Sequence, residues 1–142
     1  MTRYSELASV TKILLERELD AHRQSLDHSR RIAGELAQMD AMREAAQADA
    51  GAITARQILG ADTLWQGWMV RKRAEILRRA ALARAHEQET LARARLAFSR
   101  SQATEELVEK ERKARIRKLA LADADRIDEL GQLRRALERD DC

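Results

Sequence analysis

The sequence has no proline, one cysteine, five glycines and few aromatic residues: two tryptophans, one tyrosine and one phenylalanine. The lone cysteine, Cys142, cannot form an internal disulfide framework or a metal site. No stretch approaches the ~18 apolar residues that a membrane span needs, and acidic residues appear before any apolar signal core. We therefore expect a cytoplasmic protein.

Charged residues make up 36% of the chain, although the net charge is only +3. The apolar 44% consists largely of alanine and leucine. Alanine is the best helix former but buries little area, so this composition favours long helices with narrow contacts over a broad core. Disorder is disfavoured because leucine and alanine are abundant while glycine and proline are scarce. The composition predicts an all-α fold.

Glycines are the main candidates for helix breaks. Gly60 follows a helical pattern and suits the left-handed position after a helix. Asp62 or Thr63 can then cap the next helix. Gly34 and Gly51 lie within helical sequence and are expected only to weaken it locally, with Gly51 as the next-best break.

These signals predict one hairpin over residues 1–142, with helices at about 4–59 and 64–139 and a turn at about 60–63. Apolar residues recur at steps of three, four and seven, which is typical of coiled coils, although the phase shifts along the chain. The rows are Leu15, Leu19, Leu26, Ala33 and Leu36, then Trp65, Met69, Ile76 and Ala83, then Leu96, Ala103, Leu107, Ala114 and Leu121. The short turn favours antiparallel packing of the two helices.

The second helix is the longer one and is expected to project beyond the first. A turn at 60–63 places Tyr4 opposite about residue 119, so residues from about 120 to 139 lack an internal partner. This segment still carries Ile127, Leu130 and Leu137, which are candidate partner-binding residues because an uncovered apolar row favours binding.

The sequence shows no sign of catalysis. Phosphate-binding glycine loops, dinucleotide fingerprints and zinc-protease motifs are absent. The three histidines are scattered, and His22 and His28, six residues apart, lie on different faces of a helix. We expect no enzyme activity, no cofactor and no metal.

Two tryptophans, Trp65 and Trp68, form a W-x-x-W motif at the start of the second helix. Their spacing places them on one side of a helix. Together with Met69, Arg71 and Lys72 they form a candidate interface, since tryptophan and arginine are enriched at interaction hot spots. Packing at the hairpin tip is an equally open interpretation.

Basic clusters at residues 71–84 and 110–118 raise the question of nucleic-acid binding. Acidic residues flank both clusters, and aromatic side chains that stack on bases are nearly absent. These patterns favour a solvated face and an acidic protein partner. Direct membrane insertion is not expected, because the apolar rows are thin and rich in alanine.

Several segments together resemble the FliJ and YscO families of type III secretion, which serve flagellar and virulence export. The resemblance rests on three segments. They are the N-terminal block Leu7-Ala8-Ser9-Val10-Thr11-Lys12-Ile13-Leu14, the start of the second helix at Leu64-Trp65-Gln66-Gly67-Trp68, and the alanine-rich charged run through Leu119. None of these is a catalytic signature. The resemblance spans nearly the whole chain.

This resemblance implies a coiled-coil stalk that binds a hexameric export ATPase and also contacts an export-gate membrane protein and substrate chaperones. It would lie in the cytoplasm, peripheral to a membrane-embedded secretion apparatus. We expect the C-terminal end of the second helix, together with the N-terminal turn of the first helix around Leu7 and Val10, to dock in the ATPase ring. The alternatives are a cytoplasmic scaffold or adaptor, a self-associating rod and a nucleic-acid-associated basic rod.

Overall fold

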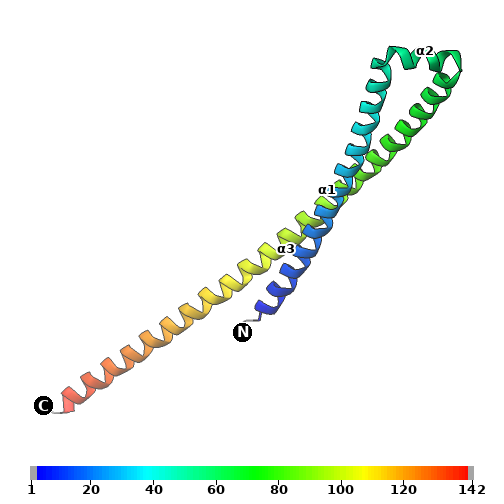
Figure 1. Ribbon diagram of the computed structural model, residues 1–142. Helices are drawn as coiled ribbons and strands as arrows, with labels where there is room; N and C mark the ends of the chain where they lie inside the picture. The colour runs from blue at the N-terminus through cyan, green and yellow to red at the C-terminus, as the bar shows by residue number, and fades with distance from the viewer. Residues whose placement is uncertain (1–2, 141–142) are drawn as a thin grey trace. The chain divides into compact units, whose positions relative to one another are not determined.

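The computed structural model describes residues 3–140, apart from the side chains of residues 50 and 52. It consists of three α-helices, α1 (Ser5–Ala48), α2 (Ala50–Ile58) and α3 (Ala61–Asp140), as Figure 1 shows. No strand occurs in residues 3–140, so the all-α prediction is confirmed. None of these helices combines the length and apolar character required to cross a bilayer. Cys142 lies outside the described residues.

The first helix is shorter than the expected span of 4–59. It ends at Ala48, and α2 is a separate helix that begins after Asp49. Aspartate and glycine are poor helix formers, so Asp49 followed closely by Gly51 is enough to interrupt the helix. Gly51 thus lies beside a real break, where we had expected only a local weakening.

The turn between α2 and α3 depends on Gly60. Its φ angle is 70°, the left-handed conformation expected from the sequence. The Gly60 amide donates to the Gln57 carbonyl at 3.2 Å and the Leu59 amide to the Ala55 carbonyl at 3.2 Å. These bonds satisfy carbonyl groups at the end of α2. Because the turn is this tight, α3 starts at Ala61, three residues earlier than predicted.

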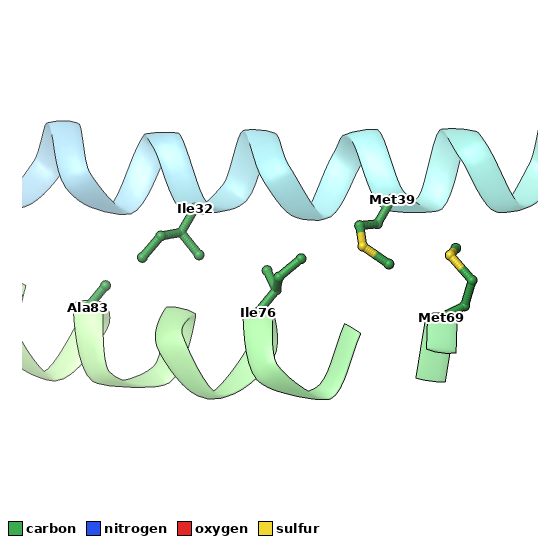
Figure 2. Close-up of a cluster of buried hydrophobic side chains, with 5 residues drawn as sticks. All are labelled: Ile32, Met39, Met69, Ile76 and Ala83. Carbon is green, nitrogen blue, oxygen red and sulfur yellow. The ribbon is translucent and has the colours of Figure 1, made fainter. Parts of the chain in front are cut away.

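The chain divides into two units, residues 14–97 and a terminal unit made of residues 3–13 and 98–140. In the 14–97 unit, α1 and α3 pack against each other around buried apolar side chains. Figure 2 shows Ile32 and Met39 of α1 directed toward Ile76 and Met69 of α3. Ile32 and Ile76 are each only 1% exposed, and Leu36, Ala80 and Trp65 pack around them.

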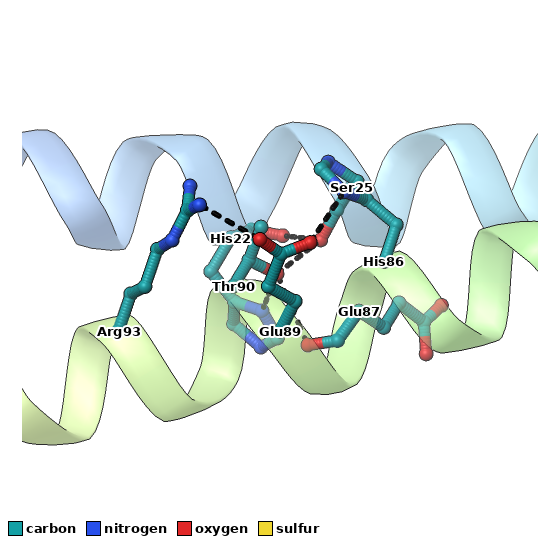
Figure 3. Close-up of polar contacts among 7 residues, drawn as sticks. All are labelled: His22, Ser25, His86, Glu87, Glu89, Thr90 and Arg93. Carbon is teal, nitrogen blue, oxygen red and sulfur yellow. Dashed lines mark hydrogen bonds and ion pairs between the residues drawn. The ribbon is translucent and has the colours of Figure 1, made fainter.

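A polar layer occupies the same seam farther from the turn (Figure 3). Thr90 Oγ1 lies 2.8 Å from Ser25 Oγ and 2.9 Å from His22 Nδ1. The two hydroxyl groups also contact backbone carbonyls, Ser25 to His22 at 2.8 Å and Thr90 to Glu87 at 3.0 Å. Each hydroxyl group has a single hydrogen to donate among these contacts, and which atom donates between His22 Nδ1 and Thr90 depends on the imidazole tautomer. Such a layer fixes which residues face each other.

The terminal unit repeats this design with smaller side chains. Thr11 Oγ1 and Thr104 Oγ1 lie 2.7 Å apart, and Thr104 is 7% exposed. Ser101 is 4% exposed, so this part of the seam also buries hydroxyl groups instead of large apolar side chains. Short side chains allow helices to approach closely, but they remove little apolar area from water.

Seven-residue spacing relates the buried positions on each helix. On α1 they are Ser25, Ile32 and Met39. On α3 they form two series with this spacing: Met69, Ile76, Ala83, Thr90, Ala97 and Thr104, and beside them Ala94 and Ser101. The expected phase shift within this seam was therefore wrong. The predicted row Leu96, Ala103, Leu107, Ala114 and Leu121 is exposed throughout, because threonine, serine and alanine occupy the buried positions and leucine does not.

Ion pairs between α1 and α3 border the apolar part of the seam. Arg79 binds both carboxylate oxygens of Glu35, with nitrogen–oxygen distances of 2.7 and 3.1 Å. Arg73 Nε lies 3.2 Å from Asp40 Oδ1. The hydrogen bonds from Arg79, together with its positive charge, lower the pKa of Glu35. Bidentate geometry makes Glu35–Arg79 the more specific of the two pairs.

Replacing Ile76 with alanine tests the seam. Truncation of a fully buried isoleucine should lower the free energy of unfolding by about 2–5 kcal/mol, from lost transfer energy and the cavity left behind. The neighbouring Leu77 is 42% exposed, so Leu77→Ala is the matched control and should have a smaller effect. Chemical denaturation followed by circular dichroism measures both, and equal losses would contradict the seam assignment.

Glu35→Gln tests the bidentate pair through its pH dependence. A carboxylate with a lowered folded-state pKa stabilises the fold above its ordinary pKa, and this contribution disappears as pH falls through the lowered value. Wild type should therefore melt above the variant near neutral pH, and the two should converge in acid. The difference should be small and reduced by salt, since the pair is partly exposed. Glu44→Gln, which alters an exposed carboxylate of the same helix, is the control.

Candidate protein-interaction surfaces

A hollow of about 360 Å³ lies where the end of α1, α2 and the start of α3 meet. Its walls combine apolar and charged side chains. The lining residues are Arg43, Ala46, Gln47, Ile53, Arg56, Gln57, Asp62, Trp65, Gln66, Met69, Val70 and Arg73. We call this the tip hollow.

Arg56 connects the three helices around the tip hollow. Its Nη2 donates to the Ala46 carbonyl of α1 at 2.9 Å. Its Nε lies 3.5 Å from Asp62 Oδ1 of α3, and its guanidinium lies 5.4 Å from the centre of the Trp65 ring. A planar cation suits both the aromatic face and the carboxylate. The single arginine of α2 thus holds this short helix against both long ones.

The two tryptophans of the W-x-x-W motif have different environments. Trp65 is half-buried against Arg56 and the apolar core, whereas Trp68 is 44% exposed. Met69 is 6% exposed and belongs to the core. Arg71 is exposed, and Lys72 is half-buried, with its Nζ 3.6 Å from Glu75. The structure therefore places Trp68 and Arg71 on the surface and Met69 beneath it.

Sequence reasoning missed several exposed apolar residues around the turn. Ile58, Leu59 and Leu64 are 80%, 79% and 77% exposed, the highest values among the large apolar side chains. One compositional signal was present. The 26 residues from 45 to 70 contain only three charged side chains, Asp49, Arg56 and Asp62, in a chain that is 36% charged. Low charge with exposed apolar groups is typical of interaction surfaces.

The C-terminal part of α3 forms a second surface, which we call the arm, residues 112–140. Thr11 faces Thr104, so an antiparallel count places Tyr4 opposite Glu111, not opposite residue 119. The uncovered segment therefore begins about eight residues earlier than predicted, because α2 is not among the residues through which α1 and α3 pair. Every described residue of the arm is exposed except Gly131, which is half-buried.

The arm carries large apolar side chains on one side of the helix. All of them are at least half exposed: Ile116 51%, Leu119 61%, Ile127 68%, Leu130 66%, Leu133 61% and Leu137 67%. At 100° per residue they fall within about 60° on either side of Leu130. Leu121 is equally exposed but lies nine residues before Leu130, half a turn away. The named six form the arm row.

The arm row has a different phase from the seam. Continuing the seam by sevens leads from Thr104 to Lys118, and from Ser101 through the half-buried Val108 to Arg115. Lys118 and Arg115 are both charged and exposed. A charged pair of positions cannot extend an apolar seam. The arm row is thus a separate apolar surface and not a frayed end of the same contact.

Leu7 and Val10, the predicted N-terminal contact residues, are 46% and 52% exposed. They lie on α1 in the terminal unit, beside Thr11, which holds the seam. Ile13 is also exposed, at 65%. These side chains add a small apolar surface to the terminal unit.

No group of three or more metal-ligating side chains lies together in residues 3–140. The comparisons with known proteins found no family model, no curated protein and no solved structure that matches this chain. The surfaces themselves are therefore the basis for inferring the function.

Replacing Arg56 with alanine should loosen the tip hollow. In a Trp68→Phe background, in which Trp65 is the only tryptophan, its fluorescence should shift to the red and become easier to quench with acrylamide. The reason is the loss of the cation–π contact, worth about 0.5–1 kcal/mol, together with the two polar contacts of Arg56. Arg43→Ala, which lines the same hollow, is the control. An unchanged Trp65 emission in Arg56→Ala would show that α2 is held by other contacts.

Proposed function

We propose that this protein is a non-enzymatic antiparallel coiled-coil hairpin that serves as the stalk of a bacterial type III protein export apparatus, binding its hexameric ATPase. The observation that carries the proposal is the arm. It extends α3 beyond the last residue that α1 covers and carries a separate apolar row. A helix of this kind suits the central channel of a ring.

Burial of the arm row would contribute favourable free energy to binding. Burying a leucine or isoleucine side chain is worth roughly 1.5–3 kcal/mol relative to leaving it in water. Six such side chains are exposed on one side of the arm. Inside a ring lumen they would be covered by the surrounding subunits.

The charge pattern supports the same placement. Residues 110–118 contain six basic side chains and one acidic side chain. Arg112 and Lys113 share Glu109, whereas Arg115, Arg117 and Lys118 form no ion pair within residues 3–140. Unpaired basic groups accelerate association with an acidic surface. We propose that they steer the arm into an acidic lumen.

The tip surface, formed by Trp68, Arg71, Ile58, Leu59 and Leu64, is proposed to contact the export-gate membrane protein and substrate chaperones. Exposed apolar side chains next to a basic residue suit an interface with an apolar centre and a polar rim. The chain would lie in the cytoplasm, peripheral to the membrane-embedded apparatus. ATP would be hydrolysed by the ring and not by this chain.

Leu130→Asp combined with Leu137→Asp tests the stalk function. Both side chains are exposed, so the hairpin should keep its helix content. Loss of two buried leucines at ~1.5 kcal/mol or more each should weaken binding to the purified ATPase by about a hundredfold or more. Stimulation of ATP hydrolysis should fall in parallel.

Leu121→Asp is the matched control, because it changes an equally exposed leucine on the opposite side of the arm. It should retain stimulation of the ATPase. If all three chains stimulate equally, or if wild type has no effect, the stalk function is wrong and a general scaffold or adaptor replaces it.

A further inference from the structure

On the side of the arm that carries the arm row, residues 116–133 have a symmetric order of side chains that includes two charged residues. Six positions follow one another at steps of three, four, three, four and three residues. They are Ile116, Leu119, Asp123, Arg126, Leu130 and Leu133. Read from either end, the order is two apolar residues, two residues of opposite charge and two apolar residues. This order and spacing make the segment complementary to its own reverse.

An antiparallel pair of arms aligns these positions in layers. If residue 116 faces residue 133 of a second copy, then 119 faces 130 and 123 faces 126. The outer layers then pair isoleucine with leucine and leucine with leucine. Each of the two central layers pairs an aspartate with an arginine. Each arm thus gives its four apolar side chains an apolar partner and its two charges an opposite charge.

The flanking positions agree with this alignment near its centre. Ala120 and Ile127 each follow a layer position, and at one edge of the layers Ala120 lies beside Ile127 of the second copy, which widens the apolar contact on both sides of the charged layers. Ile127 is 68% exposed in the single chain, so this contact also covers side-chain surface. Farther out along the same edge, Lys113 lies beside Arg134 of the second copy. The repulsion between these like charges limits the contact to the symmetric segment.

The single chain leaves all of these groups uncovered. Among residues 3–140, the one ion pair of Asp123 and Arg126 is with each other, at 3.7 Å, and their side chains are 72% and 77% exposed. An exposed pair three residues apart contributes little to stability. Its charges are therefore free to exchange partners across an interface without measurable loss of helix stability.

From this symmetry we infer that the arm row binds the arm row of a second copy of this chain, antiparallel, around two Asp123–Arg126 pairs. The apolar layers supply the attraction, and the central charges fix the direction and the register. This inference does not depend on the proposed stalk function. If both hold, the second copy and the ATPase ring compete for the same row, and the dimer is the form that protects the row before the ring binds it.

A charge exchange on the full-length chain tests the inference. Asp123→Arg places arginine against arginine in both central layers, and Arg126→Asp places aspartate against aspartate. Each single variant should shift the mass in solution from two chains to one. The double variant, Asp123→Arg with Arg126→Asp, restores opposite charges in both layers and should restore the dimer.

Sedimentation equilibrium under reducing conditions measures these masses, and circular dichroism checks that each variant stays helical. Asp125→Arg introduces the same charge change at an exposed position outside the row and should remain dimeric. Orientation is read separately in a Cys142→Ser background. Mixed Ile116→Cys and Leu133→Cys chains should cross-link to each other, and Ile116→Cys should not cross-link to itself.

Three results would overturn the inference. They are a wild-type chain that remains a single copy over a wide concentration range, single charge variants that keep the dimer, or a double variant that fails to regain it. A monomeric wild type that still activates the ATPase through Leu130 and Leu137 would remove self-association and leave the stalk function intact. A dimer with no effect on the ATPase would remove the stalk function and leave self-association intact.

Discussion

Along most of the seam, each long helix in the described part of the chain can bury side chains only against the other long helix. Where α1 and α3 pack, a residue is covered only if it lies on the narrow strip that faces the other helix, and burial follows seven-residue spacing in consequence. Near the turn the strip is filled by Ile32, Met39, Met69 and Ile76, and farther along by alanine, serine and threonine. The large apolar side chains that fall off the strip stay in water, and most of the leucines are among them. Both candidate interaction surfaces result from this limit.

The two surfaces arise in different ways. At the tip, α2 interrupts the pairing, and Arg56 replaces the seam as the contact between helices. This leaves Ile58, Leu59 and Leu64 without a facing helix. In the arm, α3 continues past the end of α1 and its apolar residues change phase. Because that change of phase places Arg115 and Lys118 at the former seam positions, a longer α1 would not have covered the arm row. The arm therefore has to be covered by another molecule or remain exposed.

The sequence was sufficient for the helical class, the glycine at the turn and the apolar character of the arm. These features follow directly from residue chemistry. A chain rich in alanine and without proline favours helix, and Gly60 suits the left-handed position that ends one. The seam in the distal half could not be predicted from apolar periodicity, because Ser25, Thr90 and Thr104 are polar. Their hydroxyl groups are buried where another hydroxyl or a carbonyl group faces them. Arg56 was also missed, since its role depends on contacts with Ala46, Asp62 and Trp65 that require three helices to meet. The predicted start of the arm lay about eight residues too far along the chain, because the prediction counted the residues of α2 as part of the paired helix.

Charged residues at the centre of the arm row bear on how tightly any partner can hold it. Enclosing Asp123 and Arg126 in an interface removes water from both groups, and the attraction between them offsets that desolvation only in part. A row made of leucine throughout would bind more tightly but would accept either direction and several registers. The two charged residues thus lower the affinity of the contact and restrict its direction and register. A self-associated arm with such a centre is held mainly by its outer Ile116–Leu133 and Leu119–Leu130 layers, so it can be opened by a partner that covers the whole row, including Leu137, and offers acidic groups to Arg115, Arg117 and Lys118. One arm cannot do both at once, but reversible self-association would not prevent binding in a ring, because the first uses only the symmetric centre of a surface that the second would cover completely.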